Sequence, residues 1–323
     1  MFQRLLVTGG CGLIGSSLVE RALRAGVRVK VLDNLSTGTR DNLPGDPAVD
    51  LVVGDVCDDA LVSELVRGCD AVAHLAAGVG VGLILSRPTG SLRQSLLGTE
   101  IVLRHAAAAR RPVFFASTSE VYGESQGDPL REESGAGFGP PNQLRFSYAA
   151  GKAAGEALAF AYAHEYSLPL AVGRFFNVTG PRQLPEHGAV VPRFVRQALA
   201  GGPLTVHGDG RQTRSFLDVR DAAEYVWRLL LAAPTGGTLL NIGRDDPVTI
   251  LELARRVRDL ASTRAAIEHA EPAYGSGFVE IRHRRPDVSR LRTLTGYEPR
   301  YPLDETLREC VYRAELSRRT HSR

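Results

Sequence analysis

Tyr148 and Lys152 are the residues of this chain whose types and spacing most directly suggest chemistry. Side chains four residues apart lie on the same face of a helix. Lys and Arg total 39, yet lysine occurs only at Lys30 and Lys152, so 37 are arginine. A compact ammonium on a thin stem can reach between a substrate hydroxyl and a phenol, which a planar guanidinium cannot. The pair therefore predicts a catalytic tyrosine beside a lysine, although an ordinary surface pair has the same spacing.

A glycine-rich turn follows the first expected strand, at residues 4–7. Gly9, Gly12 and Gly15 form G-x-x-G-x-x-G, and apolar residues at helical spacing come next. Such glycines permit a tight turn and let backbone N–H groups approach a pyrophosphate at the helix N-terminus. A second expected strand ends at Asp33, the position typical of the acid that binds the adenosine ribose hydroxyls. This pattern predicts NAD rather than NADP, although a turn aspartate is the simpler interpretation of Asp33 alone.

Further strands should end near the same cofactor. Residues 51–53 form a strand that leads into Asp55 and Val56, and residues 71–77 form one that runs into small residues. His74 lies in an apolar run and is expected to be a structural histidine. The expected cofactor-binding residues are Gly9, Gly12, Leu13, Ile14, Gly15, Asp33, Asn34, Asp55, Val56, Leu75, Ala76, Ala77, Tyr148 and Lys152.

A cluster of hydroxyl groups and one acid follows the fifth expected strand, at residues 112–116. It consists of Ser117, Thr118, Ser119 and Glu120. Ligands of doubly wound sheets bind at the carboxyl ends of strands, so this cluster is a candidate functional site. A Ser/Thr turn with a solvated glutamate is the alternative. The Gly/Pro-rich residues 123–143 are long enough to form a lid or substrate loop.

Six strands that alternate with helices predict an α/β fold, a Rossmann doubly wound parallel sheet with a smaller mixed α/β C-terminal lobe. The first domain is expected over residues 1–176, with a returning segment at about 215–242. The second lobe is expected over 177–214 and 243–315, and residues 316–323 form a polar tail.

The composition narrows the functional class. The formal net charge is +3, and no basic run carries interleaved aromatic residues, so nucleic acid is not expected as a partner. The four cysteines show neither metal nor disulfide spacing, which fits a reducing compartment and predicts no metal site. No apolar run is long enough to cross a bilayer, and the chain begins without a signal peptide. These features predict a cytoplasmic protein without a membrane partner.

Together these motifs are similar to those of the extended short-chain dehydrogenase/reductase family that acts on nucleotide sugars. The resemblance covers nearly the whole chain, because residues 174–177, 205–210, 214 and 284–287 also follow in family order. It implies tightly bound NAD, a UDP-sugar substrate, and a homodimer paired through helices near 89–110 and 146–166. The C-terminal lobe would then be the nucleotide-sugar-binding lobe.

The family chemistry explains the residue types. Free tyrosine has a pKa of roughly 10 and is a weak base at neutral pH. The resemblance implies that Lys152 and the nicotinamide charge favour the phenolate of Tyr148. Tyr148 would take the proton of the sugar 4-hydroxyl while C4 gives hydride to NAD, and Thr118 would hydrogen-bond the same oxygen. The product is a 4-keto sugar.

The residues after Thr118 separate the subfamilies. The 4,6-dehydratases carry Asp-Glu there, whereas this chain has Ser119 and Glu120, and serine is a poor proton donor to a leaving hydroxyl. Thr-Ser-Glu resembles the UDP-glucuronate decarboxylases (UDP-xylose synthases), in which oxidation at C4 creates a β-keto acid that loses carbon dioxide. Glu120 would then orient the carboxylate or manage the proton near C5. Arg145 would help to steer an anionic sugar.

The resemblance assigns two residue sets. The catalytic residues would be Thr118, Ser119, Glu120, Tyr148, Lys152 and Arg214. The substrate-binding residues would be Arg145, Asn177, Val191, Thr205, His207, Arg214, Arg284 and Asp287.

We expect decarboxylation of UDP-glucuronate that gives UDP-xylose, or UDP-4-keto-xylose where the final reduction is slow. Two departures from the family pattern keep open the alternative, a UDP-hexose or UDP-hexuronate 4-epimerase. Ser95 stands where asparagine is common, and residues 78–85 look closer to proteins described as epimerases. A non-catalytic NAD-sensing or scaffold protein of the same fold is a third possibility, and the intact Thr118, Tyr148 and Lys152 set speaks against it.

Overall fold

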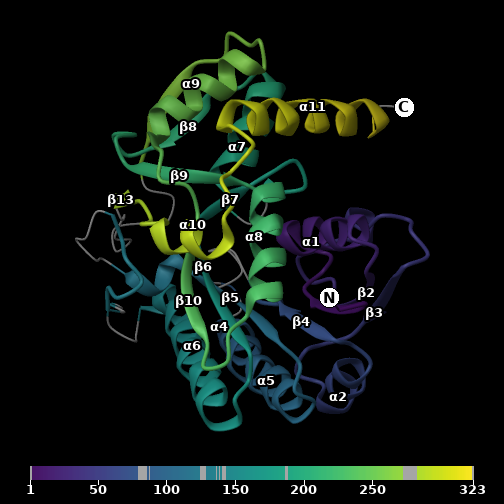
Figure 1. The fold of residues 1–323 in the computed structure, drawn as a ribbon. Helices are drawn as coiled ribbons and strands as arrows, with labels where there is room; N and C mark the ends of the chain where they lie inside the picture. Colours follow the sequence, from purple (N-terminus) through teal and green to yellow (C-terminus); the bar gives the residue numbers. More distant parts are fainter. Residues whose placement is uncertain are drawn as a thin grey trace.

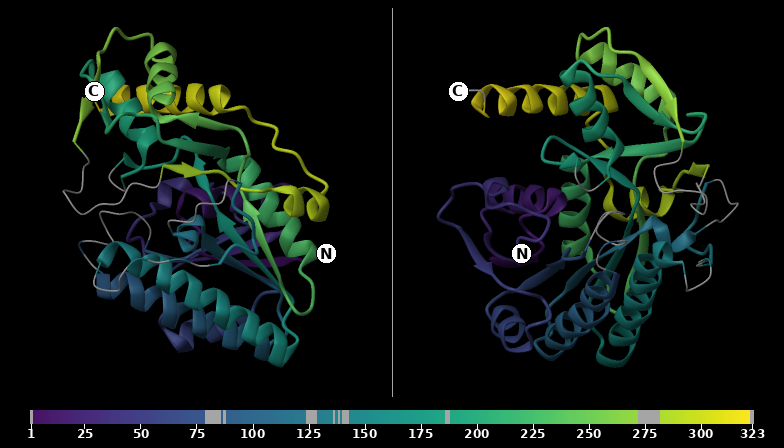
Figure 2. Two further views of the ribbon diagram at one scale, coloured as in Figure 1. Left: turned by 90° about the vertical axis from the view of Figure 1, so that its left-hand side faces the viewer. Right: turned by 180° about the vertical axis from the view of Figure 1, so that it is seen from behind.

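The computed structural model describes residues 2–78, 86, 88–123, 129–135, 137, 139, 143–185, 188–271 and 282–321. The chain forms a large lobe built on one sheet and a smaller lobe that sits against the carboxyl ends of its strands (Figure 1). Helices cover both faces of the large sheet, as the two further views show (Figure 2).

The large sheet has seven strands in the order β10-β6-β5-β4-β1-β2-β3, and every pairing is parallel. The strands are β1 (Arg4–Thr8), β2 (Arg28–Asp33), β3 (Val49–Val53), β4 (Ala71–His74), β5 (Val113–Thr118), β6 (Leu170–Phe175) and β10 (Thr238–Ile242). The predicted doubly wound parallel sheet is confirmed. The seventh strand, β10, enters from the second half of the chain and pairs with β6.

Two hydrophobic cores hold helices against this sheet. The first lies between the sheet and α1 (Leu13–Arg24), α8 (Val219–Ala232) and α10 (Ser289–Thr295). The second lies on the opposite face, under α2 (Asp59–Arg67), α5 (Thr99–Ala108) and α6 (Ser147–Tyr166). Short elements connect the layers: η1 (Arg40–Asn42), α4 (Pro88–Arg93), η2 (Gln94–Gly98), η3 (Ser119–Tyr122) and η4 (Leu144–Phe146).

His74 is the structural histidine that the apolar run predicted. Its Nδ1 lies 2.8 Å from the Thr8 hydroxyl and its Nε2 lies 3.1 Å from the Thr99 hydroxyl. Burial, and to a lesser degree the positive charge of Lys152, lowers the pKa of His74 to about 3. The ring is therefore neutral and serves to join β1, β4 and α5.

The smaller lobe combines two short sheets with three helices. Strands β7 (Asn177–Thr179), β9 (Thr213–Asp218), β11 (Pro247–Thr249) and β13 (His283–Arg284) form one sheet, and β8 (Leu204–His207) pairs with β12 (Ile267–Ala270). Helices α7 (Val190–Ala200), α9 (Ile250–Leu260) and α11 (Leu303–His321) share its core. Figure 2 shows α11 extending out from this lobe toward the C-terminus.

Two buried aspartates on either side of the start of α8 fasten the C-terminal segment to the large lobe. Asp221 accepts hydrogen bonds from the Tyr297 hydroxyl at 2.6 Å and from the backbone N–H groups of Arg300 and Tyr301. Asp218 caps α8 and accepts the Thr306 hydroxyl. Among the helices that the structure describes, none has both the length and the apolar character needed to cross a membrane.

Candidate active site

A continuous cavity of about 610 Å³ lies between the two lobes, at the carboxyl ends of the strands of the large sheet. It runs from the glycine turn after β1, past the ends of β2, β4, β5 and β6, to β8, β9 and β13 of the smaller lobe. The predicted site residues that line it are Gly9, Gly12, Leu13, Ile14, Gly15, Asp33, Asn34, Val56, Leu75, Ala76, Ala77, Thr118, Glu120, Tyr148, Lys152, Asn177, His207, Arg214 and Arg284.

The glycine turn is built too tightly for side chains. Gly9 has φ +72°, and a Cβ there would lie 2.8 Å from the backbone nitrogen of Ala76. A Cβ on Gly15 would lie only 2.2 Å from the carbonyl oxygen of Gly9. Helix α1 begins directly after Gly12, and no side chain caps its first N–H groups. Exposed N–H groups at a helix N-terminus are what a pyrophosphate requires, so this end of the cavity fits NAD.

Two aspartates, Asp33 and Asp55, lie near the glycine turn, and only Asp33 lines the cavity. Asp33 lines the cavity and accepts the backbone N–H groups of Cys11 at 2.9 Å and Leu35 at 2.8 Å. Each of its oxygens still has a lone pair for a ribose hydroxyl. Asp55 does not line the cavity; it accepts the side-chain amide of Asn34 at 3.0 Å and the backbone N–H of Cys57. Burial alone would raise the pKa of Asp55, and those hydrogen bonds outweigh it and lower the pKa.

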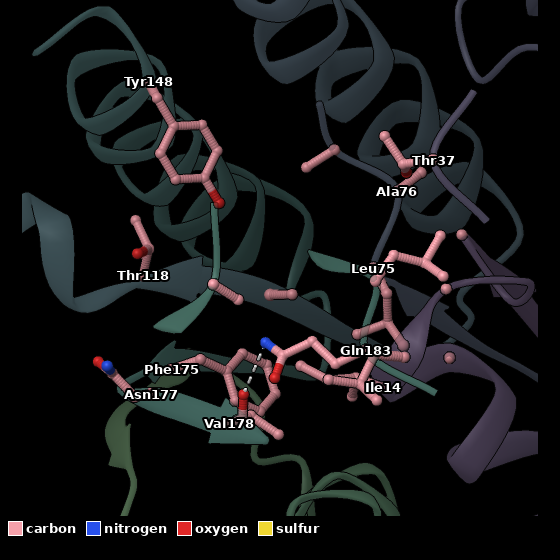
Figure 3. Close-up of a pocket in the computed structure, with 18 of the residues that line it drawn as sticks. Ile14, Thr37, Leu75, Ala76, Thr118, Tyr148, Phe175, Asn177, Val178 and Gln183 are labelled. Carbon is pink, nitrogen blue, oxygen red and sulfur yellow. Dashed lines mark hydrogen bonds between the residues drawn. The ribbon is translucent and has the colours of Figure 1, made fainter. Parts of the chain in front are cut away.

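Tyr148 and Thr118 face each other across the middle of the cavity. Figure 3 shows the phenol oxygen of Tyr148 pointing into the space above Phe175, with the Thr118 side chain beside it. Tyr148 stands in the first turn of α6, and Thr118 is the last residue of β5. Burial raises the pKa of Tyr148, the Glu120 carboxylate raises it further, and a hydrogen bond with Thr118 opposes both. Because its pKa is raised, the phenol keeps its proton at neutral pH unless a positive charge lies beside it.

Lys152 lies one helical turn deeper than Tyr148 and is only 1% exposed. Its ammonium donates to the carbonyl oxygen of Ala116 at 2.7 Å and sits 4.8 Å from the centre of the Phe115 ring. Burial lowers the pKa of Lys152 to about 8, although the carboxylate of Glu156 raises it. The pKa of Lys152 therefore lies close to physiological pH.

Two oppositely charged side chains, Glu120 and Arg284, lie beyond Thr118, on the side of the smaller lobe. Glu120 forms an ion pair with Arg284, whose side chain is 7% exposed. Arg284 pairs through its backbone with Arg214, since β13 and β9 are neighbours, and both arginines line the cavity. The cavity therefore offers one acid and two cations close to the end of β5.

Four further predicted residues are described but do not line the cavity. Ser119 is 3% exposed and buried beside the cavity wall, and Val191 belongs to the core of the smaller lobe. Thr205 is bonded to Gln197 through its backbone N–H and its hydroxyl. Asp287 accepts a hydrogen bond from the backbone N–H of Ser289 and forms an ion pair with Arg131. The fifth, Arg145, lies in η4, and its side chain falls outside the described part of the chain.

Several cavity residues were not predicted from the sequence. Arg182 is the clearest, because its guanidinium donates to Glu20 at 2.9 Å, to the Asn42 carbonyl at 2.8 Å and to Ser17 at 3.2 Å. These bonds draw the segment after β7 across the cofactor end of the cavity. Gln183 lies beside it and donates to the Val178 carbonyl (Figure 3). Other lining residues that were not predicted include Ser36, Thr37, Gln94, Leu184, Arg193 and Gln212.

Comparisons with known proteins agree with this geometry. Residues 5–243 match the model of the NAD dependent epimerase/dehydratase family. The chain is 35% identical over 317 residues to a UDP-N-acetyl-alpha-D-glucosaminuronate decarboxylase of Bacillus cytotoxicus, covering 96% of this chain and 97% of that protein. It is 35% identical to UDP-glucuronic acid decarboxylase 6 of Arabidopsis thaliana, over 94% of this chain and 87% of the relative.

A solved structure is similar over the same length. The UDP-glucose 4-epimerase of Thermus thermophilus, in complex with NAD, superposes with a TM-score of 0.85 at 31% identity. The match covers 97% of this chain and 99% of that one. With the glycine turn, Asp33 and the Tyr148/Lys152 pair gathered around one cavity, this chain belongs to the NAD dependent epimerase/dehydratase family, as its motifs predicted, and NAD is its cofactor.

Proposed function

We propose that this chain decarboxylates UDP-glucuronate through a 4-keto intermediate and releases UDP-xylose, UDP-4-keto-xylose or both. The observation that carries the proposal is the Glu120–Arg284 ion pair, which lines the same cavity as Thr118, Tyr148 and Lys152. Oxidation at C4 requires only the last three residues. A sugar that carries a carboxylate also needs a cation to bind that group and an acid near C5. Arg284 and Glu120 would supply them. Two relatives named as nucleotide-sugar decarboxylases support it.

The cofactor would be held by the glycine turn and its surroundings. The N–H groups at the start of α1 would bind the pyrophosphate, and Asp33 would bind the adenosine ribose hydroxyls. Arg182 would keep the segment after β7 closed over this part of the cavity. NAD, when bound, supplies a hydride acceptor for C4 and a positive ring near the phenol.

The first step belongs to Tyr148, Thr118 and Lys152. The phenolate of Tyr148 would take the proton of the sugar 4-hydroxyl as C4 loses hydride, and Thr118 would hold that oxygen in place. The ammonium of Lys152, one helical turn further along α6, would favour the charged phenolate, because opposite charges lower the pKa of an acid. This opposes the burial and the Glu120 carboxylate, both of which raise the pKa of Tyr148.

The second step would fall to Glu120 and the two arginines. The 4-keto sugar is a β-keto acid, so the bond between C5 and the carboxyl carbon breaks and its electrons pass toward the C4 carbonyl. Arg284 and Arg214 line the cavity and would bind the carboxylate before it leaves. Glu120 would manage the proton that C5 then receives. Return of the hydride to C4, and of the proton from Tyr148 to its oxygen, would give UDP-xylose, whereas release before that step would give UDP-4-keto-xylose.

A 4-epimerase is the second candidate, because a UDP-glucose 4-epimerase is 31% identical over 97% of this chain. That reaction uses the same first step and then reduces the ketone from its other face. The Glu120–Arg284 pair has no role in that reaction.

We also propose that the protein is a cytoplasmic homodimer. The absence of metal or disulfide spacing among the four cysteines supports a reducing compartment. The family resemblance implies pairing through α5 and α6, which lie side by side on one face of the sheet. Sedimentation velocity should give twice the 34.8 kDa chain mass. A single-chain mass at micromolar concentration would exclude the dimer.

Product mass distinguishes the candidate activities. Incubation with NAD and UDP-glucuronate labelled at the carboxyl carbon should release labelled carbon dioxide and leave a UDP-pentose. An isomer of unchanged mass would instead support epimerisation. Failure to convert any UDP- or dTDP-sugar would favour a non-catalytic NAD-binding protein. The Tyr148→Phe protein is the matched control, and it should release no label.

Glu120→Gln tests the residue that carries the proposal. The amide keeps the shape of Glu120 but cannot carry its charge, so decarboxylation should fall about 10²–10⁴-fold while bound NAD is retained. The matched control is Glu133→Gln, which removes an exposed acid paired with Arg290 away from the cavity and should leave the rate unchanged. A wild-type rate in the Glu120 variant would remove this residue from the mechanism.

Lys152→Met should separate stability from activity. Replacing a buried ammonium by an apolar side chain of similar length should raise the free energy of unfolding by about 1–4 kcal/mol at pH 7 and abolish turnover. The folded-state pKa of Lys152 is lowered from 10.5 to about 8, so between those values the unfolded chain binds the extra proton. Wild-type stability should therefore rise with pH across this window, and the advantage of the variant should shrink.

Urea unfolding of NAD-free protein between pH 7 and pH 10 checks this prediction. Lys30→Met is the control, because Lys30 is exposed, is paired with Asp50, and is the other lysine of the chain. It should change stability by less than ~0.5 kcal/mol. A Lys152→Met protein less stable than wild type at pH 7 would show that the buried ammonium is not destabilising.

A further inference from the structure

Glu156 is a buried acid that the proposed reaction does not use. It is 6% exposed and lies four residues after Lys152 and eight after Tyr148 on α6. Residues at this spacing lie on one face of a helix. The three side chains therefore form a row that leads from the cavity into the core.

The carboxylate of Glu156 bridges two neighbouring strands. Arg174 on β6 donates to both oxygens, from Nε at 2.9 Å and from Nη2 at 2.7 Å. Ser117 on β5 donates its hydroxyl to Oε1 at 2.5 Å. Ser117 and Arg174 are directly paired in the sheet, and Ser117 immediately precedes Thr118. One carboxylate thus ties the helix that carries Tyr148 and Lys152 to the strand that carries Thr118.

Arg174 extends this link toward the substrate side. Its guanidinium lies 4.6 Å from the centre of the Tyr122 ring and donates to the Glu132 carbonyl at 3.3 Å. The Tyr122 hydroxyl donates to the side chain of Asn241 at 2.6 Å. Asn241 in turn donates to the carbonyls of Leu130 and Asp287. The cluster therefore touches the segment after Arg284 as well.

Glu156 also sets the charge around Lys152. The other groups that face the ammonium are the Ala116 carbonyl, the Phe115 ring and His74, which is neutral. Tyr148 lies one turn above on α6. Arg174 on β6 forms an ion pair with Glu156, so its positive charge partly neutralises the carboxylate that acts on Lys152. Glu156 is thus the acid that keeps the proton on Lys152 against the effect of burial.

We propose that Glu156 is a positioning residue for the oxidation step: through Arg174 and Ser117 it fixes Thr118 relative to Tyr148 and Lys152. Oxidation at C4 is shared by decarboxylation and epimerisation. The proposal therefore does not depend on which of these reactions the protein completes.

The test variant is Glu156→Gln combined with Arg174→Gln. The single Glu156 change would leave Arg174 as an unpaired buried charge and could unfold the protein, whereas two amides can still bond to each other. In the double variant, kcat at pH 7.5 should fall about tenfold or more, while the bound NAD content and KM for the sugar stay the same. The alkaline limb of kcat should move to lower pH, since removal of the acid lowers the pKa of Lys152.

A second measurement needs no turnover. The chain has only two lysines, so protein labelled with carbon-13 lysine gives two Cε resonances, one for Lys152 and one for the exposed Lys30. In the holoenzyme, Lys152 should titrate at lower pH in the double variant than in wild type, with Lys30 unchanged. This result stands even where UDP-glucuronate proves not to be a substrate, so failure of the two proposals can be told apart.

Two controls isolate the effect. Ser117→Ala removes a hydrogen bond but no charge, so the titration of Lys152 should not move. Glu224→Gln removes an acid of α8 that is paired with Arg21 and Arg228 and does not line the cavity, so neither kcat nor the titration should change. A Lys152 titration identical in wild type and the double variant would overturn the electrostatic role. A fall in kcat matched by lost NAD and lowered thermal stability, with an unmoved pH limb, would reduce Glu156 to a structural residue and overturn the proposal.

Discussion

A buried ammonium group is the constraint on which the large lobe depends. Lys152 carries its charge into a region where an unpaired ion is strongly unfavourable. The fold compensates with the Ala116 carbonyl, the face of Phe115 and the carboxylate of Glu156. His74, in the same layer, is kept neutral by its burial and by the charge of Lys152, both of which lower its pKa, so it adds no second charge. The remaining imbalance lowers the pKa of Lys152, so the stability of the lobe and the state of its reactive group are set by the same contacts.

The parallel sheet explains why this charge lies beside a cavity. Parallel strands end at one edge, so the glycine turn after β1, Asp33 after β2 and Thr118 at the end of β5 meet there, although they are far apart in the chain. Helix α6 starts at the same edge and runs back along the sheet. Its Tyr148, Lys152 and Glu156 therefore form a sequence from the cavity wall to the core. The reacting phenol lines the cavity because it stands in the first turn of α6, and Lys152 and Glu156 follow it toward the core.

The parts of the site that depend on local spacing could be predicted from the sequence. The glycine turn, Asp33 and the Tyr148/Lys152 pair are each fixed by a strand, a turn or one helical turn, and the predicted fold class is confirmed. Ser119 shows where adjacency to a strand end was not enough. It begins the 3-10 turn η3 directly after β5 and is buried, so it does not line the cavity although Thr118 and Glu120 do.

Long-range partners could not be predicted in this way. Arg182 and Glu20 are 162 residues apart, and Arg284 and Glu120 are 164 residues apart. No periodicity or motif links such pairs, because only the folded chain brings them together. The same holds for Glu156, whose partners Ser117 and Arg174 come from two different strands. Its spacing from Lys152 is visible in the sequence, but the bridge that it makes is not.

The Glu120–Arg284 pair also bears on how an anionic substrate would be handled. Before binding, the acid and the cation neutralise each other, so Arg284 is stabilised in a nearly buried position. A sugar carboxylate that enters would compete with Glu120 for Arg284, and Arg214 is close enough in the sheet to share the added negative charge. When carbon dioxide leaves, that charge moves from the lost carboxylate to the oxygen at C4, near Tyr148. Arg284 is then available to Glu120 again, just as C5 needs a proton. An uncharged hexose would cause no such exchange of partners, which is why this pair, rather than the shared oxidising residues, favours decarboxylation.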